Sequence, residues 1–257
     1  MPDIGYEDKD FWDRLYTAEE EQEEKGLTED SWVEGEDGER LFDQLVLEAA
    51  QGKDVVDVGC GQGEFTLEIA RVARLVVGID FAPRAIAGAL RRMKGKESPN
   101  VEFRRAEANS IPYPDESFDL AVSRRGPATD SLESRNEAFR VLRRGGRLLE
   151  TTIGERNMLN WGQVFGRGQI DPRVKVSEAK RKLLLAAGFR RVDVEEFEAP
   201  EYFHAIKDVI MRLENSPILP DYDPQADAGR LREIERRFRT RKGIETNSHR
   251  VIIKATK

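Results

Sequence analysis

Three alternate glycines after an apolar segment are the residues whose types and spacing point most directly to chemistry in this chain. The stretch from Val55 to Phe65 reads VVDVGCGQGEF. We expect a buried strand before the glycines and a helix after them. Glycine tolerates a positive φ and lets a ligand approach the backbone closely. Amides at the start of a helix favour carboxylate or phosphate groups. We therefore expect a ligand-binding turn at Gly59, Gly61 and Gly63.

The residues around this turn indicate which ligand it takes. The dinucleotide fingerprint needs a glycine at position 64, where the chain has Glu64, whose carboxylate would repel a pyrophosphate. The phosphate-loop pattern is also absent, because no Gly-Lys-Ser/Thr follows. Asp80 ends the next apolar segment, where an acid can accept hydrogen bonds from both hydroxyls of a ribose. A ligand with a ribose and no phosphates is favoured.

Alternating apolar and amphipathic segments must position these residues. Helical spacing of apolar residues predicts helices at 39–50, 65–72, 83–93, 133–142 and 177–187. Short apolar runs predict strands at 55–58, 75–79, 101–105, 118–123, 147–152, 192–197 and 250–255. A turn is expected at Gly145-Gly146, before the fifth strand. This alternation is typical of an α/β fold with a doubly wound, largely parallel sheet.

Residues 153–174 and 198–246 do not fit the alternation, and the chain begins with an acidic stretch. Residues 1–50 hold 18 acidic and 4 basic side chains, and the aromatics among residues 6–34 suggest short helices fastened to the body. We interpret residues 1–38 as an acidic arm or lid and 39–257 as the main domain. Within that domain, residues 198–246 contain helical patterns at 203–213 and 228–241, separated by prolines at 217, 220 and 224. Because insertions at strand ends usually shape binding sites, we expect 198–246 to be a helical substrate cap.

The composition excludes several classes of site and location. Cys60 is the single cysteine and there are two histidines, which excludes an internal disulfide and makes a metal centre unexpected. No apolar stretch approaches the roughly 20 residues that span a membrane, and the first residues do not resemble an export signal. We expect no metal, no membrane association and a cytoplasmic location, and the sequence leaves the oligomeric state open.

The motifs together resemble the class I S-adenosylmethionine-dependent methyltransferases. The resemblance is carried by VVDVGCGQG at 55–63, GID at 78–80, Glu107-Ala108, FDLAVS at 118–123 and FRVLRRGGRL at 139–148. It covers roughly residues 40–197 and implies a Rossmann-like sheet of seven strands, one of them antiparallel, with 249–255 supplying the last strand. It also implies S-adenosyl-L-methionine as the cofactor.

The resemblance assigns roles around the methionine and ribose parts of this cofactor. Asp57 would order the glycine turn and hold the methionine amino group, directly or through water. Asp80 would bind the ribose hydroxyls. Ser123 would lie by the methionine portion and the reacting centre. The turn would form a backbone wall against the cofactor through Gly59, Cys60, Gly61 and Gly63.

The adenine end involves three further positions. Phe81 would pack on the adenine ring, although core packing is an equal alternative. Glu107 would accept a hydrogen bond from the adenine amino group beside the Ala108 amide, with a solvated loop acid as the competing interpretation. Cys60 is interpreted as a small residue that the turn tolerates, not as a nucleophile.

The acceptor is less well defined than the donor. Methyl transfer from a sulfonium needs positioning more than a dedicated base, and no catalytic residue is identified. Arg124 and Arg125 follow the fourth strand, where they either bind an anionic group on the substrate or pair with acids such as Glu150 or Glu155. Trp161 and Tyr202 are further substrate candidates, with core packing as the alternative, as are Phe165, Phe203 and Tyr222.

Three functions remain open at this point. The leading hypothesis is a methyltransferase for a small-molecule acceptor, since the Asp/Asn-Pro-Pro-aromatic motif of amino-methylating nucleic-acid enzymes and the second cysteine of carbon-5 pyrimidine enzymes are both absent. The alternative is an RNA methyltransferase that uses the basic stretch 230–242, although such runs are usually solvated helix faces. The third is a non-catalytic subunit that binds the cofactor and regulates a partner.

Overall fold

The computed structural model describes residues 9–94, 99–126, 131–168, 171–216, 218–219 and 221–257. The expected turns at Pro217 and Pro220, and residues 1–8 of the acidic arm, lie outside them. The chain divides into two compact units. Unit 1 comprises Met1–Asp37, Ile153–Lys175 and Phe197–Arg250, and unit 2 comprises Gly38–Thr152, Val176–Glu196 and Val251–Lys257.

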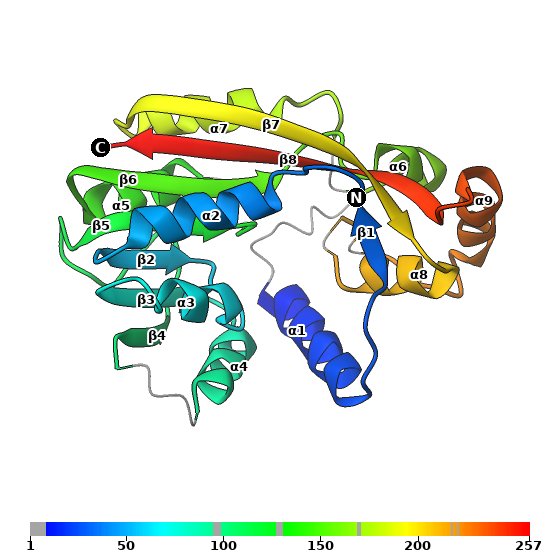
Figure 1. The fold of residues 1–257 in the computed structure, drawn as a ribbon, viewed down its shortest axis with the longest axis horizontal. Helices are drawn as coiled ribbons and strands as arrows, with labels where there is room; N and C mark the ends of the chain where they lie inside the picture. Colours follow the sequence, from blue (N-terminus) through cyan, green and yellow to red (C-terminus); the bar gives the residue numbers. More distant parts are fainter. Residues whose placement is uncertain (1–8, 95–98, 127–130, 169–170, 217, 220) are drawn as a thin grey trace. The chain divides into compact units, whose positions relative to one another are not determined.

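Seven neighbouring strands of the sheet follow the order β7-β8-β6-β5-β2-β3-β4. Unit 2 contains most of them, including the parts of β7 and β8 that lie within 176–196 and 251–257. The parallel strands are β2 (Asp54–Val58), β3 (Leu75–Asp80), β4 (Val101–Arg105), β5 (Phe118–Arg124) and β6 (Leu142–Ile153). Beside them lie β7 (Arg190–Phe203) and β8 (Ile244–Thr256), and Figure 1 shows β8 running opposite to both of its neighbours. The Rossmann-like α/β fold with one antiparallel strand is therefore confirmed.

An eighth strand was not expected. In unit 1, β1 (Ser31–Val33) pairs antiparallel with the end of β7, where Trp32 lies opposite Tyr202. Within the described part of the acidic arm, residues 9–38, the structure has one helix, α1 (Lys9–Glu24), followed by this strand, where several short helices were expected.

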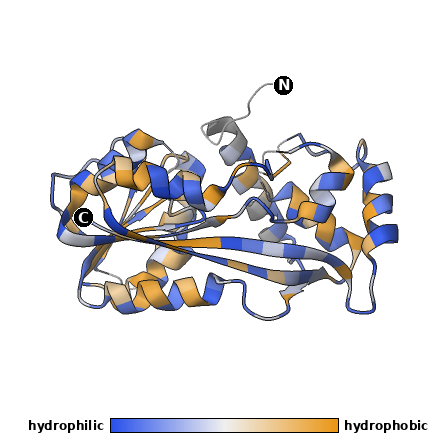
Figure 2. Cartoon of the chain, turned by 90° about the horizontal axis from the view of Figure 1, so that it is seen from above, coloured by the Kyte–Doolittle hydropathy of each residue, from blue (hydrophilic) through white to orange (hydrophobic). Residues whose placement is uncertain are grey.

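Five helices flank the sheet of unit 2. They are α2 (Glu39–Ala50), α3 (Glu64–Ile69), α4 (Pro83–Met93), α5 (Leu132–Val141) and α7 (Val176–Ala186). Helices α2, α3 and α4 pack beside one another and α5 packs against α7, and Figure 1 shows the two groups on opposite faces of the sheet. The helices carry apolar and polar residues side by side (Figure 2), as expected for helices that bury one face.

Local sequence explains where several of these elements begin. Every residue of β2 is buried, as expected for an apolar strand at the centre of a parallel sheet. Pro83 occupies the first turn of α4, where its missing N–H costs no hydrogen bond. Ser131 caps α5, and its hydroxyl accepts a hydrogen bond from the Ser134 amide at 3.1 Å.

Three expected boundaries were wrong. The Gly145-Gly146 pair lies inside β6 because this strand starts at Leu142, and the pairing of β5 with β6 shifts in register there. Strands β7 and β8 are longer than their apolar cores, so 198–203 and 244–246 are strand and not part of a helical insertion. Pairing with neighbouring strands extends an element beyond the residues whose pattern identifies it.

Unit 1 has a hydrophobic core of its own. Its helices besides α1 are α6 (Leu159–Phe165), α8 (Ile206–Glu214) and α9 (Ala228–Phe238). Trp161 and Phe165 of α6 pack with Phe203, Leu213 and Ile234 in this core. Among the described helices of both units, none is long and apolar enough to cross a membrane.

Candidate functional site

The glycine turn lies at the carboxyl ends of β2 and β3. The amides of Gly59 and Cys60 both donate to the Ile79 carbonyl, at 2.9 and 3.0 Å, which joins the turn to the end of β3. Gly59, Gly61 and Gly63 have φ values of 76°, 53° and 81°. The positive φ expected at these three positions is therefore present, and the sequence folds this way because only glycine adopts it without strain.

The third glycine is also required by packing. A Cβ atom on Gly63 would lie 2.5 Å from Cζ of Phe103 and 2.9 Å from Cβ of Ala89. A Cβ on Gly78, in β3, would approach the same Phe103 ring at 2.8 Å. Strand β4 and helix α4 therefore hold the start of α3 directly against the end of β2.

Asp57 presents a buried carboxyl with one engaged oxygen and one without a partner. Its side chain is 2% exposed, and Oδ2 accepts a hydrogen bond from the hydroxyl of Thr66, in α3, at 2.6 Å. Among the described residues, Oδ1 has no hydrogen-bond partner although it is buried. Burial, together with the nearby charge of Asp80, raises the pKa of Asp57 to about 6. The unsatisfied oxygen suits a positively charged hydrogen-bond donor.

Asp80 has a second role that the sequence reasoning missed. Its Oδ2 accepts from the Gly61 amide at 3.0 Å, and its Oδ1 accepts from the Ala82 amide at 2.9 Å. The carboxylate thus joins the glycine turn to the residues that follow β3. An aspartate that bonds the amide two residues on is a recognisable turn pattern, which the sequence D-F-A-P at 80–83 already contained.

Ser123 joins β5 to β2 at the same edge. Its hydroxyl is buried and donates to the Val58 carbonyl at 3.1 Å. A Cβ on Gly59 would lie 3.2 Å from Cα of Gly126, so the loops after the two strands approach closely. Together with the glycine turn, Asp57 and Asp80, Ser123 lies at the carboxyl ends of three neighbouring parallel strands. This is where doubly wound folds bind ligands.

The residues expected at the adenine lie beside the ends of β3 and β4. Phe81 is half-buried, and its carbonyl accepts from Nε of Arg105 at 3.1 Å. Glu107 is exposed and Ala108 is buried in the core of unit 2. Cys60 is half-buried, and burial raises the pKa of its thiol well above the ordinary range, which disfavours the nucleophilic thiolate.

Arg124 forms ion pairs with residues of helix α2. Its Nε and a terminal nitrogen contact the two Asp43 oxygens at 2.8 and 3.1 Å, and Glu39 lies 3.3 Å away. Its guanidinium also covers the Phe65 ring at 5.2 Å. The alternative that Arg124 pairs with acids is therefore confirmed, but its partners are Asp43 and Glu39 and not Glu150 or Glu155.

Those two acids are bound elsewhere. Glu150 is buried with Arg135 and Lys180, whose charges hold its pKa near about 2 against the effect of burial. Glu155 pairs with Arg156 and Lys175.

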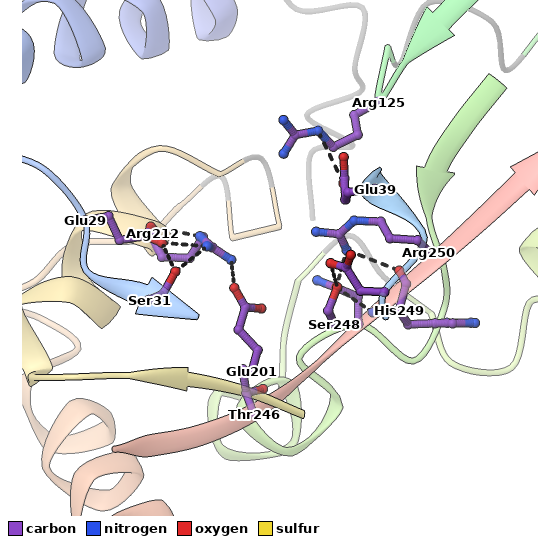
Figure 3. Close-up of polar contacts among 12 residues, drawn as sticks. Glu29, Ser31, Glu39, Arg125, Glu201, Arg212, Thr246, Ser248, His249 and Arg250 are labelled. Carbon is purple, nitrogen blue, oxygen red and sulfur yellow. Dashed lines mark hydrogen bonds and ion pairs between the residues drawn. The ribbon is translucent and has the colours of Figure 1, made fainter. Parts of the chain in front are cut away.

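Arg125 differs from its neighbour. It adopts a left-handed backbone conformation with φ 58° directly after β5, and its side chain is about half exposed. Nε lies 3.7 Å from a carboxylate oxygen of Glu39, and Figure 3 shows the two side chains facing each other. A positive φ in an arginine is uncommon and often marks a functional loop.

Trp161 and Tyr202 are packed within unit 1. Trp161 is 1% exposed, lies 5.0 Å from the Phe203 ring, and donates to the Glu245 carbonyl at 3.2 Å. Tyr202 stacks on Trp32 at 4.8 Å and is covered by Lys242. The alternative of core packing therefore describes both residues in this structure.

Unit 1 contains a buried charge cluster that no sequence pattern indicated. Arg212 of α8 contacts Glu29 at 2.5 Å and Glu201 of β7 at 2.9 Å, and it also bonds Ser31 of β1 (Figure 3). Sequence reasoning missed it because its members are far apart in the chain and each is an ordinary charged residue alone.

Four of the seven cations in the basic stretch 230–242 pair with neighbouring acids. Arg237 pairs with Glu233 at 2.9 Å and Arg239 with Glu235 at 2.6 Å, both along α9. Further pairs join Arg230 to Asp227 and Lys242 to Glu34. In the part of the chain that the structure describes, no group of three or more His, Cys, Asp or Glu side chains is arranged to hold a metal ion.

Similarity to known proteins covers the part of the chain that contains the glycine turn. A family model described as a methyltransferase domain matches residues 49–183. Demethylmenaquinone methyltransferase of Listeria welshimeri is 29% identical over 125 residues, 47% of this chain and 53% of that protein. O-methyltransferase cnsE of Penicillium expansum is 29% identical over 168 residues, 62% of this chain and 60% of that protein. The chain thus spans about half the length of the first of these relatives.

A solved structure extends the similarity to nearly the whole chain. The [4+2]-cyclase SpnF superposes with a TM-score of 0.65 over 98% of this chain and 96% of its own, at 23% identity. At this identity the likeness concerns the fold alone, and fold does not fix chemistry.

Proposed function

Because the chain belongs to the class I S-adenosylmethionine-dependent methyltransferases, with S-adenosylmethionine as its cofactor, we propose that it transfers the methyl group to a small-molecule acceptor. The observation that carries this proposal is the pair of buried carboxylates, Asp57 and Asp80, at the ends of neighbouring strands around the glycine turn. The acceptor class is supported by the names of two relatives, a demethylmenaquinone methyltransferase and an O-methyltransferase.

The residues present fit the cofactor. The unpartnered Oδ1 of Asp57 would hold the methionine ammonium group, which supplies the missing donor to a buried acceptor. Asp80 would accept from the ribose hydroxyls while it keeps its bonds to Gly61 and Ala82. The turn would present its backbone to the cofactor because Gly59, Gly61 and Gly63 carry no side chain.

Phe81, Glu107, Ala108 and Ser123 keep the roles expected of them as part of this proposal. Ser123 would act through its position, since its hydroxyl already donates to Val58. The Ala108 side chain is buried in the core, so its backbone amide is the group that a ligand would use. Glu107 is exposed and thus accessible to a ligand amino group.

S-adenosylmethionine supplies a methyl group on a positively charged sulfur, an electrophile that needs no further activation. The task of this chain is to orient donor and acceptor in line and to keep water from the reacting atoms. Arg124 is held by Asp43 and Glu39. Arg125, which is about half exposed beside Glu39, would contact an anionic acceptor.

The 1–38 arm and the 198–246 segment stay proposed as lid and substrate cap. The ion pairs along 230–242 weaken the RNA alternative, because counterion release by free cations drives binding to a phosphate backbone. The non-catalytic alternative predicts that the chain binds S-adenosylmethionine but does not convert it to S-adenosylhomocysteine.

The experiment that tests the proposal uses S-adenosylmethionine labelled in its methyl group. Purified protein is incubated with the metabolite fraction and, separately, with the RNA fraction of a cell extract. We expect label in a small molecule and formation of S-adenosylhomocysteine. Label in RNA would contradict the small-molecule proposal and support an RNA methyltransferase. Tight cofactor binding without label in either fraction would favour the non-catalytic subunit.

A matched pair of variants connects that activity to the site. Asp80→Asn should weaken S-adenosylhomocysteine binding by about 1.5–3 kcal/mol, because the amide cannot accept on both sides as a charged carboxylate does. Asp193→Asn, at an exposed position on β7, should leave binding unchanged. Equal affinities of the two folded variants would contradict the role of Asp80.

A further inference from the structure

Unit 1 contains a cavity of about 540 Å³ that is separate from the glycine turn. It is formed entirely by residues of this unit, from α1, the following Lys25 and Leu27, the end of α8 and residues up to Pro224. Its volume lies in the range of small-molecule sites. No role in methyl transfer has been assigned to it.

The inner part of the cavity is apolar. Leu15 of α1, Leu213 of α8 and Leu219 line it, and their exposed fractions are 6%, 2% and 4%. The Tyr222 ring adds an aromatic wall and packs against Phe165 at 6.3 Å between ring centres. A ligand body of hydrocarbon character would therefore be desolvated there.

Two opposite charges without partners lie in the same lining. Arg14 projects from α1 and Glu214 lies at the end of α8, and neither has an ion pair or side-chain hydrogen bond within the described residues. The other charged residues of the lining, Glu21 and Lys25, pair with each other at 3.3 Å. Within the described residues, the apolar wall is thus accompanied by Arg14 and Glu214 as charges without an ion-pair partner. Partial burial raises the pKa of Glu214, as expected for a carboxyl that lacks a counter-charge.

We propose that this cavity is a binding site for a zwitterionic amphiphile, a small molecule with an ammonium group, a carboxylate or similar anion, and an apolar body. The ammonium group would pair with Glu214 and the anion with Arg14. The body would lie on Leu15, Leu213 and Leu219. The Tyr222 ring would add to the surface that contacts this body.

The test measures binding of three probes of equal chain length by calorimetry. These are 2-aminooctanoic acid, octanoic acid, which lacks the ammonium group, and octylamine, which lacks the carboxylate. We expect 2-aminooctanoic acid to bind at least about fivefold more tightly than either of the others, as two partly exposed ion pairs allow. Equal affinities for the three probes, or no binding of any at millimolar concentration, would overturn the proposal.

Charge-neutral variants distinguish the two ends of the ligand. Glu214→Gln should remove the advantage of 2-aminooctanoic acid over octanoic acid, and Arg14→Gln should remove its advantage over octylamine. Both side chains are exposed and without partners, so the fold should tolerate the changes. Glu233→Gln, an exposed change on α9 outside the cavity, is the matched control. Unchanged probe selectivity in both lining variants would contradict the site.

Saturating S-adenosylhomocysteine separates this proposal from the proposed function. Because the cavity contains no residue of the glycine turn, 2-aminooctanoic acid should still bind in its presence. It should also bind to Asp57→Asn protein. Competition with S-adenosylhomocysteine would place the probe at the cofactor site and overturn the second site, while leaving the methyltransferase proposal intact.

Discussion

Asp57 is a buried carboxyl whose ionisation works against folding. Its pKa is raised to about 6 from the ordinary 3.8, first by burial. A raised pKa means that the folded state binds more protons than the unfolded state between pH 4 and 6. Stability from this group is therefore greatest below pH 4 and decreases until about pH 6. The difference amounts to about 3 kcal/mol.

The Asp57→Asn variant tests this effect and the proposed ligand role together. Relative to wild type, its free energy of unfolding should gain about 3 kcal/mol between pH 4 and pH 7, measured by urea unfolding. Its affinity for S-adenosylhomocysteine at pH 7 should fall, since the charged acceptor for the ammonium group is lost. The exposed Asp193→Asn change should alter neither quantity. If the stability of Asp57→Asn depends on pH as that of the wild type does, the pKa of Asp57 is not raised by burial.

At the scale of elements, Gly63 shows how strand, turn and helix depend on one position. In Gly63→Ala, the alanine would have to adopt a φ of 81°, and its Cβ would clash with the Phe103 ring. In Gly145→Ala, the alanine would have to adopt a similar φ of 74°, but its Cβ would have no atom within 4 Å. We expect a loss of about 1 kcal/mol at Gly145, from backbone strain alone. At Gly63 the loss should exceed about 2 kcal/mol because crowding is added. Thermal unfolding of both variants measures the difference, and equal losses would show that Phe103 moves aside freely.

Arg124 connects three elements of unit 2, since it lies on β5, pairs with Asp43 of α2 and covers Phe65 of α3. Arg124→Lys keeps the charge but loses the two-point contact and the stacking. We expect a loss of about 1–2 kcal/mol in urea unfolding. Arg173→Lys, at an exposed pair with Asp171, should change stability by less than about 0.5 kcal/mol. An unchanged free energy of unfolding in Arg124→Lys would mean that the contacts of Arg124 with Asp43 and Phe65 do not stabilise the fold.

At the scale of the whole molecule, the proposed lid role of residues 1–35 and 198–246 predicts a response to ligand. Hydrogen exchange in these segments should slow when S-adenosylhomocysteine binds, because closing segments become ordered. Exchange in α5, on the far side of the sheet from α2–α4, serves as the internal reference. The same protection with and without ligand would assign both segments a structural role.

The sequence alone determined the features that depend on neighbouring residues. The glycine turn, the strands that surround it and the helices of unit 2 follow from local spacing, and they sufficed to identify the family. Glycines at alternate positions after an apolar strand predict positive φ because φ is a property of each residue and its immediate neighbours.

Tertiary structure alone decided which distant residues meet. Nothing local indicates that Arg124 pairs with Asp43 instead of Glu150, because many acids were available and geometry selects among them. The same holds for β1, three residues too short to have a clear period, which exists through its pairing with β7. The cavity that joins Arg14 to Glu214 likewise depends on segments about 200 residues apart in the chain. Long-range contacts depend on the packing of the whole chain, and a residue pattern that reports only its own segment cannot specify them.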